Sequence, residues 1–94
     1  MTKISFTTVE AGHPHLDPGC WFFHEGAWAV CASTGRQDDG RWSVQIYFDK
    51  QGKPLREQSC YFATMKEAKD FVSDYFEQPV VDCEPDDFPK PSSL

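Results

Sequence analysis

A segment in the C-terminal third carries the pattern of one helix face, with a start signal before it and a stop signal after it. Its apolar residues recur at positions i, i+3, i+4, i+7 and i+8, namely Ala68, Phe71, Val72, Tyr75 and Phe76. Ahead of them, Thr64 and Glu67 have the spacing of a capping box, which satisfies two backbone N–H groups of the first turn. Pro79 prevents the helix from continuing. The sequence therefore predicts an amphipathic helix from about Met65 to Glu77.

The sequence ahead of this helix alternates in the manner of β-strands. Residues 42–48 alternate Trp, Val, Ile and Phe with Ser, Gln and Tyr, which predicts a strand with one apolar face. Segments rich in Gly, Pro and Asp separate four further strand candidates, at residues 20–24, 28–34, 56–62 and, at a sheet edge, 4–9. The expected fold class is α+β, in which an antiparallel sheet of about four strands carries the C-terminal helix on one face.

The chain has the length of one domain with one hydrophobic core. Its 94 residues fall within the usual range of about 50–200 residues for a single core. Three Trp, three Tyr and eight Phe residues can each bury roughly 150–250 Å², so the core needs no metal or disulfide. We expect residues 1–79 to form a single α+β domain. Residues 80–94, which are acidic and rich in Pro, are expected to form a tail, and its last several residues are expected to be extended or disordered when free.

The sequence also carries signals about location and redox state. No secretory signal is visible at the N-terminus, and no apolar run approaches the roughly 18 residues that span a bilayer. We therefore expect a soluble, cytoplasmic protein. The four cysteines are scattered without any C-x-x-C pair, so we expect four free thiols, at Cys20, Cys31, Cys60 and Cys83.

Residues 70–88 hold the carboxylates that give the chain its net charge of −6. Seven acidic residues and no Lys or Arg lie in that range: Asp70, Asp74, Glu77, Asp82, Glu84, Asp86 and Asp87. A concentrated acidic surface repels the phosphates of nucleic acids and suits a basic protein surface. We therefore predict that these seven carboxylates bind a basic partner, with Tyr75 and Phe88 as apolar anchors.

Our first hypothesis is a non-enzymatic inhibitor whose carboxylates imitate the phosphates of DNA. They would occupy the basic, nucleic-acid-binding surface of a protein machine, such as a CRISPR effector subunit. A small acidic domain rich in aromatic residues resembles the anti-defence proteins of phages and mobile elements, among them the anti-CRISPR proteins. That resemblance implies a stoichiometric inhibitor in the host cell cytoplasm, with no catalytic residues and no cofactor.

A second resemblance lies in residues 42–77. Trp42 at the start of a strand, a turn with Gly52 and Lys53, and residues 62–64 ahead of Glu67 are similar to the arm-type DNA-binding domain of tyrosine recombinases. In that family a three-stranded sheet lies on one helix and enters a DNA groove. The family's sheet is basic, whereas the corresponding positions here are neutral: Ser43, Gln45, Tyr47, Gln58 and Ser59. The resemblance therefore implies a fold and transfers no binding residue.

This likeness supports a second hypothesis, a small DNA-binding or recombination accessory module. It would use the sheet face together with the basic residues of the turns, namely Arg36, Arg41, Lys53 and Arg56. A third hypothesis is a structural or assembly subunit that forms a homodimer through the aromatic run at residues 20–23, because exposed aromatic patches tend to mark contacts.

Two chemical sites were weighed as alternatives. His13, His15, Asp17, Cys20 and His24 include possible zinc ligands, but structural zinc patterns contain two closely spaced pairs and this segment has one. Cys20 or Cys31 with His15 or His24 forms a possible nucleophile and base, although no glycine-rich oxyanion loop flanks either cysteine. The prediction is accordingly a protein without enzymatic activity and without a bound metal.

Overall fold

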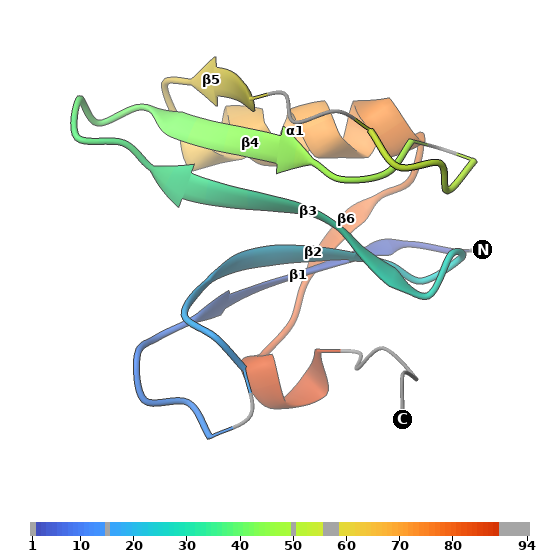
Figure 1. Cartoon of the computed structure of the whole chain (residues 1–94), viewed down its shortest axis with the longest axis horizontal. Coiled ribbons are helices and arrows are strands. Elements are labelled where there is room, and N and C mark those ends of the chain that lie inside the picture. The colour runs from blue at the N-terminus through green and yellow to red at the C-terminus, as the bar shows by residue number, and fades with distance from the viewer. Residues whose placement is uncertain (1, 15, 50, 56–58, 89–94) are drawn as a thin grey trace.

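The computed structural model describes residues 2–14, 16–49, 51–55 and 59–88. These residues form a six-stranded sheet with one α-helix and one short 3-10 helix (Figure 1). In chain order the elements are β1 (Ile4–Val9), β2 (Gly19–His24), β3 (Ala29–Arg36), β4 (Trp42–Ile46), β5 (Ser59–Phe62), α1 (Met65–Phe76), β6 (Val80–Asp82) and η1 (Pro85–Asp87). The spatial order of the strands is β5-β4-β3-β2-β1-β6.

The predicted α+β class and the helix on the sheet are confirmed, but the sheet is larger than the four strands expected and is mixed. β6 pairs in parallel with β1, while all other neighbours are antiparallel. The pairing is anchored by Ile4 N, which donates to Pro79 O at 2.8 Å, and by Cys83 N, which donates to Phe6 O at 2.8 Å. β1 was expected at an edge and instead lies between β2 and β6.

The main core lies between one face of the sheet and α1. Its buried members come from β1 to β4 and from the helix: Ile4, Phe6, Phe22, Cys31, Ala32, Val44, Ile46, Ala68, Val72 and Phe76. The register between β2 and β3 shifts at Phe22/Phe23, as at a β-bulge. The neighbouring residues Cys31 and Ala32 of β3 consequently both reach this core.

The helix has the predicted cap at its start and an unpredicted one at its end. Thr64 Oγ1 accepts a hydrogen bond from Glu67 N at 3.2 Å, as the capping pattern requires. The helix ends at Phe76, because Glu77 adopts the left-handed conformation (φ 54°). Glu77 N then donates to Asp74 O at 3.3 Å and Gln78 N to Ser73 O at 3.1 Å, which is a Schellman motif. With 12 residues, α1 is the longest helix in the described chain, and no helix there is long and apolar enough to cross a membrane.

A second, smaller cluster covers the other face of the sheet over β1 and β2. Phe88, which follows η1, is only 5% exposed, and its ring packs edge-on against Phe23 with centroids 5.8 Å apart. Trp28 packs on the same Phe23 ring at 5.1 Å. Residues 80–88 of the predicted tail are therefore part of the fold, since they form β6, η1 and this cluster. Residues 89–94 lie outside the described residues.

The burial of Phe23 also bears on the predicted dimer contact at residues 20–23. Phe22 and Phe23 are both 0% exposed, one in each core, so neither can contribute to an interface between copies. Trp21 is half-buried, and its Nε1 donates to Asp17 O at 3.1 Å. The aromatic run that suggested a dimer interface is thus mostly internal.

Candidate protein-binding site

The structure divides the seven predicted carboxylates into two groups on different parts of the molecule. Asp70 and Asp74 lie on α1 and Glu77 follows its last residue, whereas the other four lie on β6, on η1 and between them. Figure 1 places η1 at the end of the molecule away from α1. The chain reaches that end because Pro79 and β6 redirect it after the helix. One continuous acidic field over residues 70–88 is therefore not formed.

On α1 the carboxylates form an acidic stripe, defined as Glu67, Asp70, Asp74 and Glu77. Residues at spacings of three and four lie along one side of a helix, which aligns Glu67, Asp70 and Asp74, and Glu77 follows directly after the last helical residue. All four are exposed. The stripe faces away from the buried side chains of Ala68, Val72 and Phe76. Because the C-terminal end of a helix is itself partly negative, the potential is most negative toward Asp74 and Glu77.

Beside this stripe lies an acidic groove between β5 and α1, with a volume of about 330 Å³. Its lining residues are Phe62, Glu67, Asp70, Phe71 and Asp74. The rings of Phe62 and Phe71 are half-buried, with centroids 5.2 Å apart, and give the groove an apolar floor. The groove therefore combines aromatic surface with carboxylates on one wall.

The ion pairs around the acidic groove are weak. Lys66 Nζ donates to Asp70 Oδ2 at 2.9 Å, and this hydrogen bond raises the pKa of Lys66. Both side chains are largely in solvent, at 85% and 61% exposure. Exposed pairs of this kind contribute little to stability because water screens them, so a partner can displace Lys66 at little cost. Among the described residues, Glu67 and Asp74 form no ion pair.

The four carboxylates after the helix, Asp82, Glu84, Asp86 and Asp87, form a tail group with more local neutralisation. Lys69 Nζ donates to Asp82 Oδ1 at 2.9 Å and also lies 4.4 Å from the centre of the Phe6 ring. His13 Nε2 lies 3.2 Å from Asp86 Oδ1. Glu84 lines a groove of about 490 Å³ between η1 and the loop that follows β1. Two of the four carboxylates are thus already engaged within the protein.

The two predicted apolar anchors are placed differently from expectation. Phe88 is buried against Phe23 and is not an exposed contact residue. Tyr75 is half-buried, and its ring packs against Phe71 at 6.2 Å and against Phe76 at 4.9 Å. The groove residues Phe62 and Phe71 take the role of accessible aromatic surface, and neither was singled out as a contact from the sequence. The only indication of this groove in the sequence was the helical spacing of Glu67 and Asp70, which places both carboxylates in one stripe.

The sheet face opposite α1 is open over β3, β4 and β5 and is neutral. Cross-strand pairing places Ser59, Gln45 and Ser33 in one row, and Tyr61 beside Ser43 in the next. Tyr47 Oη and Ser33 Oγ are 2.6 Å apart on the same face. The predicted outward positions Ser43, Gln45, Tyr47 and Ser59 do lie on this face, while Gln58 and Arg56 lie outside the described residues.

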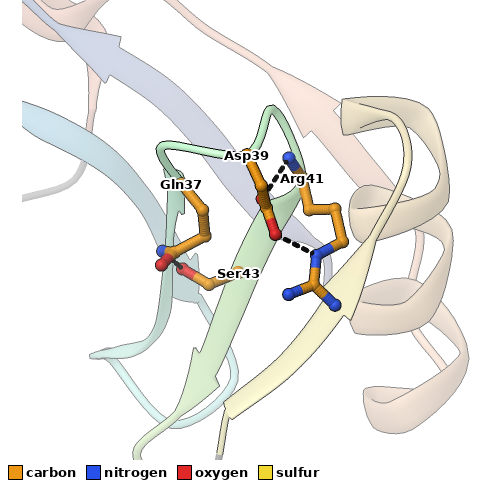
Figure 2. Close-up of polar contacts among 4 residues, drawn as sticks. All are labelled: Gln37, Asp39, Arg41 and Ser43. Atoms are coloured by element: carbon orange, nitrogen blue, oxygen red, sulfur yellow. Dashed lines mark hydrogen bonds and ion pairs between the residues drawn. The ribbon is translucent and has the colours of Figure 1, made fainter.

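The basic residue nearest to this face is held in the turn between β3 and β4 (Figure 2). Arg41 donates from its backbone N to Asp39 Oδ1 at 3.0 Å and from Nε to Asp39 Oδ2 at 2.7 Å. These two hydrogen bonds lower the pKa of Asp39, which favours the ionised carboxylate that pairs with Arg41. The guanidinium also lies 4.8 Å from the centre of the Tyr61 ring. On the other strand of the turn, Gln37 Nε2 donates to Ser43 Oγ at 3.0 Å.

Among the residues that the structure describes, those predicted as candidates for metal binding or thiol chemistry are not assembled for either task. In the part of the chain that the structure describes, no three His, Cys, Asp or Glu side chains gather to hold a metal ion, and His15 lies outside that part. All four cysteines are free, as predicted. Cys31 and His24 line one small cavity of about 100 Å³. Burial raises the pKa of Cys31 to about 12 and lowers the pKa of His24, so Cys31 stays an unreactive thiol.

In comparisons with protein-family models, curated proteins and solved structures, nothing matches the chain. Any assignment of function therefore rests on the chemistry of the described surfaces. Of those surfaces, the acidic groove with its stripe is the one that joins carboxylates to partly exposed aromatic rings in a shallow depression.

Proposed function

We propose that this protein is a non-enzymatic binding protein that docks on a basic surface of another protein through the acidic stripe and the acidic groove. The observation that carries the proposal is the groove itself, where Glu67, Asp70 and Asp74 stand beside the rings of Phe62 and Phe71. Carboxylates steer a basic partner and fix its register, whereas aromatic area slows its release. The Lys66–Asp70 pair leaves the stripe with an excess of negative charge.

The partner is a nucleic-acid-handling protein, whose Lys and Arg residues otherwise contact phosphates. The stripe places about one carboxylate on each helical turn of 5.4 Å, whereas duplex DNA carries one charge per ≈1.7 Å of axis. The charge density of the stripe is therefore lower than that of DNA, and the stripe covers only part of a basic channel. The chain resembles anti-CRISPR and other anti-defence proteins in size and composition. This likeness supports a role as a stoichiometric inhibitor that acts in the cytoplasm of the host cell.

A second candidate function is a DNA-binding module that uses the open sheet face. The contact that favours it is Arg41 against Tyr61, since an aromatic ring beside a guanidinium is a common base-stacking element. The Asp39 carboxylate opposes it, because it neutralises Arg41 at 2.7 Å. The net charge of −6 opposes binding to duplex DNA as well.

The experiment captures partners from host cells on three immobilised proteins. These are the wild type, a stripe variant (Asp70→Asn, Asp74→Asn, Glu77→Gln) and a control (Asp38→Asn), whose carboxylate is exposed on the β3–β4 turn. The proposal expects a nucleic-acid-binding protein on the wild type and on the control, released by duplex DNA and lost from the stripe variant. Equal capture by the stripe variant contradicts the proposal. A gel shift of duplex DNA by the wild type at physiological salt favours the second candidate instead.

A further inference from the structure

β5 is an edge strand whose outer side pairs with no other strand in the described chain. The direction of its peptide groups follows from two hydrogen bonds of the neighbouring hairpin. Tyr47 N donates to Cys31 O at 2.8 Å, and Gln37 N donates to Arg41 O at 2.7 Å, so the odd-numbered residues of β4 between them, Ser43 and Gln45, point their N–H and C=O groups toward β3. Trp42 and Val44 consequently point theirs toward β5.

The partners of Trp42 and Val44 across the ladder are Phe62 and Cys60. The two remaining residues of β5, Ser59 and Tyr61, therefore direct their N–H and C=O groups away from the sheet. Edge strands are usually protected by charged side chains, Pro, a bulge or a covering segment. The described residues of β5 are Ser, Cys, Tyr and Phe, so they include neither a charged side chain nor a Pro.

The other sheet edge differs from β5. β6 has three residues, and its Asp82 accepts a hydrogen bond from Lys69. Shortly after β6 the chain enters η1. A short edge with a charged residue is a poor template for a further strand. β5 is thus the edge of this sheet that can accept one.

The acidic groove lies directly beside β5, because Phe62 is both the last residue of β5 and part of the groove. Side chains of a strand alternate between the two faces of a sheet. A strand added to β5 would therefore place every second side chain on the helix side, over Phe62 and Phe71 and next to Glu67, Asp70 and Asp74. Lys and Arg suit this environment, because their alkyl stems cover aromatic surface while their charged ends reach carboxylates.

The charge of the groove decides between a second copy of the chain and a different partner. Two copies joined through β5 would bring two acidic grooves side by side, and the carboxylates of one groove would repel those of the other. A basic segment brings opposite charge to the same place. We infer that β5 and the acidic groove bind an extended segment of the partner with Lys or Arg at alternate positions, which continues the sheet as an additional strand. This inference rests on the proposed function, because it names the part of the basic partner that docks.

The probe is a capped peptide of alternating Lys and Thr, titrated into the isotope-labelled full chain and followed by NMR. The expected result is a shift of the Ser59 and Tyr61 amide signals and slower hydrogen exchange at both. A peptide with Glu in place of Lys should not bind. A peptide N-methylated at every second amide should bind about thirtyfold more weakly, because the two backbone hydrogen bonds that its N–H groups donate to Ser59 O and Tyr61 O are lost.

Two protein variants complete the test. Ser59→Pro removes one outward N–H and should weaken binding of the Lys–Thr peptide about fivefold, while Ser59→Ala, its matched control, should bind as the wild type does. If Ser59→Pro does not fold, the N-methylated peptide gives the same information on the unchanged protein.

The outcomes separate this inference from the proposed function. Equal binding of the methylated and unmethylated peptides overturns strand addition, and so does the absence of peptide binding or a shift confined to the tail group. Those results leave capture of a basic protein by the acidic stripe standing. Equal capture of cellular partners by the wild type and the stripe variant overturns the proposed function instead, whatever the peptide does.

Discussion

At the scale of single residues, Thr7 has a buried hydroxyl with no hydrogen-bond partner among the described residues. The residue is only 1% exposed, and an unpaired buried polar group costs about 1–3 kcal/mol. Thr7→Val keeps the shape and removes the hydroxyl, so it should stabilise the fold by about 1 kcal/mol. Thermal unfolding should then show a Tm about 4–8 °C higher.

The control for this variant is Thr34→Val. Thr34 is also buried, but its Oγ1 donates to Ser43 O at 2.6 Å. Its replacement leaves a carbonyl without that donor and should lower Tm. A lower Tm for Thr7→Val as well would mean that the Thr7 hydroxyl has a stabilising partner.

Glu77 is a second residue that destabilises the fold, in this case through its backbone conformation. It occupies the left-handed position of the Schellman motif (φ 54°), where Gly is usual because a Cβ atom costs roughly 1 kcal/mol there. Glu77→Gly should therefore raise the unfolding free energy by about 0.5–1 kcal/mol. Glu77→Ala removes the same carboxylate and keeps the strained backbone, so in urea unfolding it should fall below the Gly variant. The reverse order would show that the side chain, rather than the backbone, decides stability here.

At the scale of elements, β6 and η1 belong to the fold through Phe88. Phe88 is 5% exposed against Phe23, and large-to-small changes at buried Phe cost about 3–5 kcal/mol. Phe88→Ala should destabilise the protein by about 3 kcal/mol in urea unfolding. Asp87→Ala, its exposed neighbour, should change stability by less than about 0.5 kcal/mol. Wild-type stability of Phe88→Ala would contradict the second cluster and restore the predicted tail.

The elements differ in how far local sequence determines them. α1 was predicted to within one residue at its end, because caps, apolar period and Pro79 all act within the segment. β6 was not predicted as a strand, since three residues are too few for a periodic signal and its partner β1 is more than 70 residues away in sequence. Phe88 looked like part of a solvated acidic string for the same reason, as its burial depends on Phe23, far along the chain.

The candidate site was also only partly predictable. The helix carboxylates follow from the spacing of Asp70, Asp74 and Glu77, which keeps them on one side of α1. The groove needed β5 beside the helix, and pairing between distant strands is not visible in local patterns. A single acidic field over residues 70–88 was inferred from closeness in sequence, whereas η1, with Asp86 and Asp87, lies at the end of the molecule away from α1 (Figure 1) and only Asp82 of β6 stays within hydrogen-bond distance of the helix residue Lys69.

At the scale of the whole molecule, the distribution of charge predicts the oligomeric state. An unprotected β5 edge invites pairing with another copy, and carboxylates next to it oppose that pairing. We therefore expect the wild type to sediment as a monomer at physiological salt. A groove variant (Glu67→Gln, Asp70→Asn, Asp74→Asn) should dimerise as its concentration rises, because the open edge remains and the repulsion is gone.

The matched control changes the same number of charges at another place. A tail-group variant (Asp82→Asn, Glu84→Gln, Asp87→Asn) also takes the formal net charge from −6 to −3, since three carboxylates are removed in each case. If repulsion depended on net charge alone, both variants would associate equally. If it depends on the carboxylates beside β5, only the groove variant associates, and hydrogen exchange at Ser59 and Tyr61 slows with it. A wild type that dimerises through β5 would show that the acidic groove does not guard this edge, and that the segment it binds need not be basic.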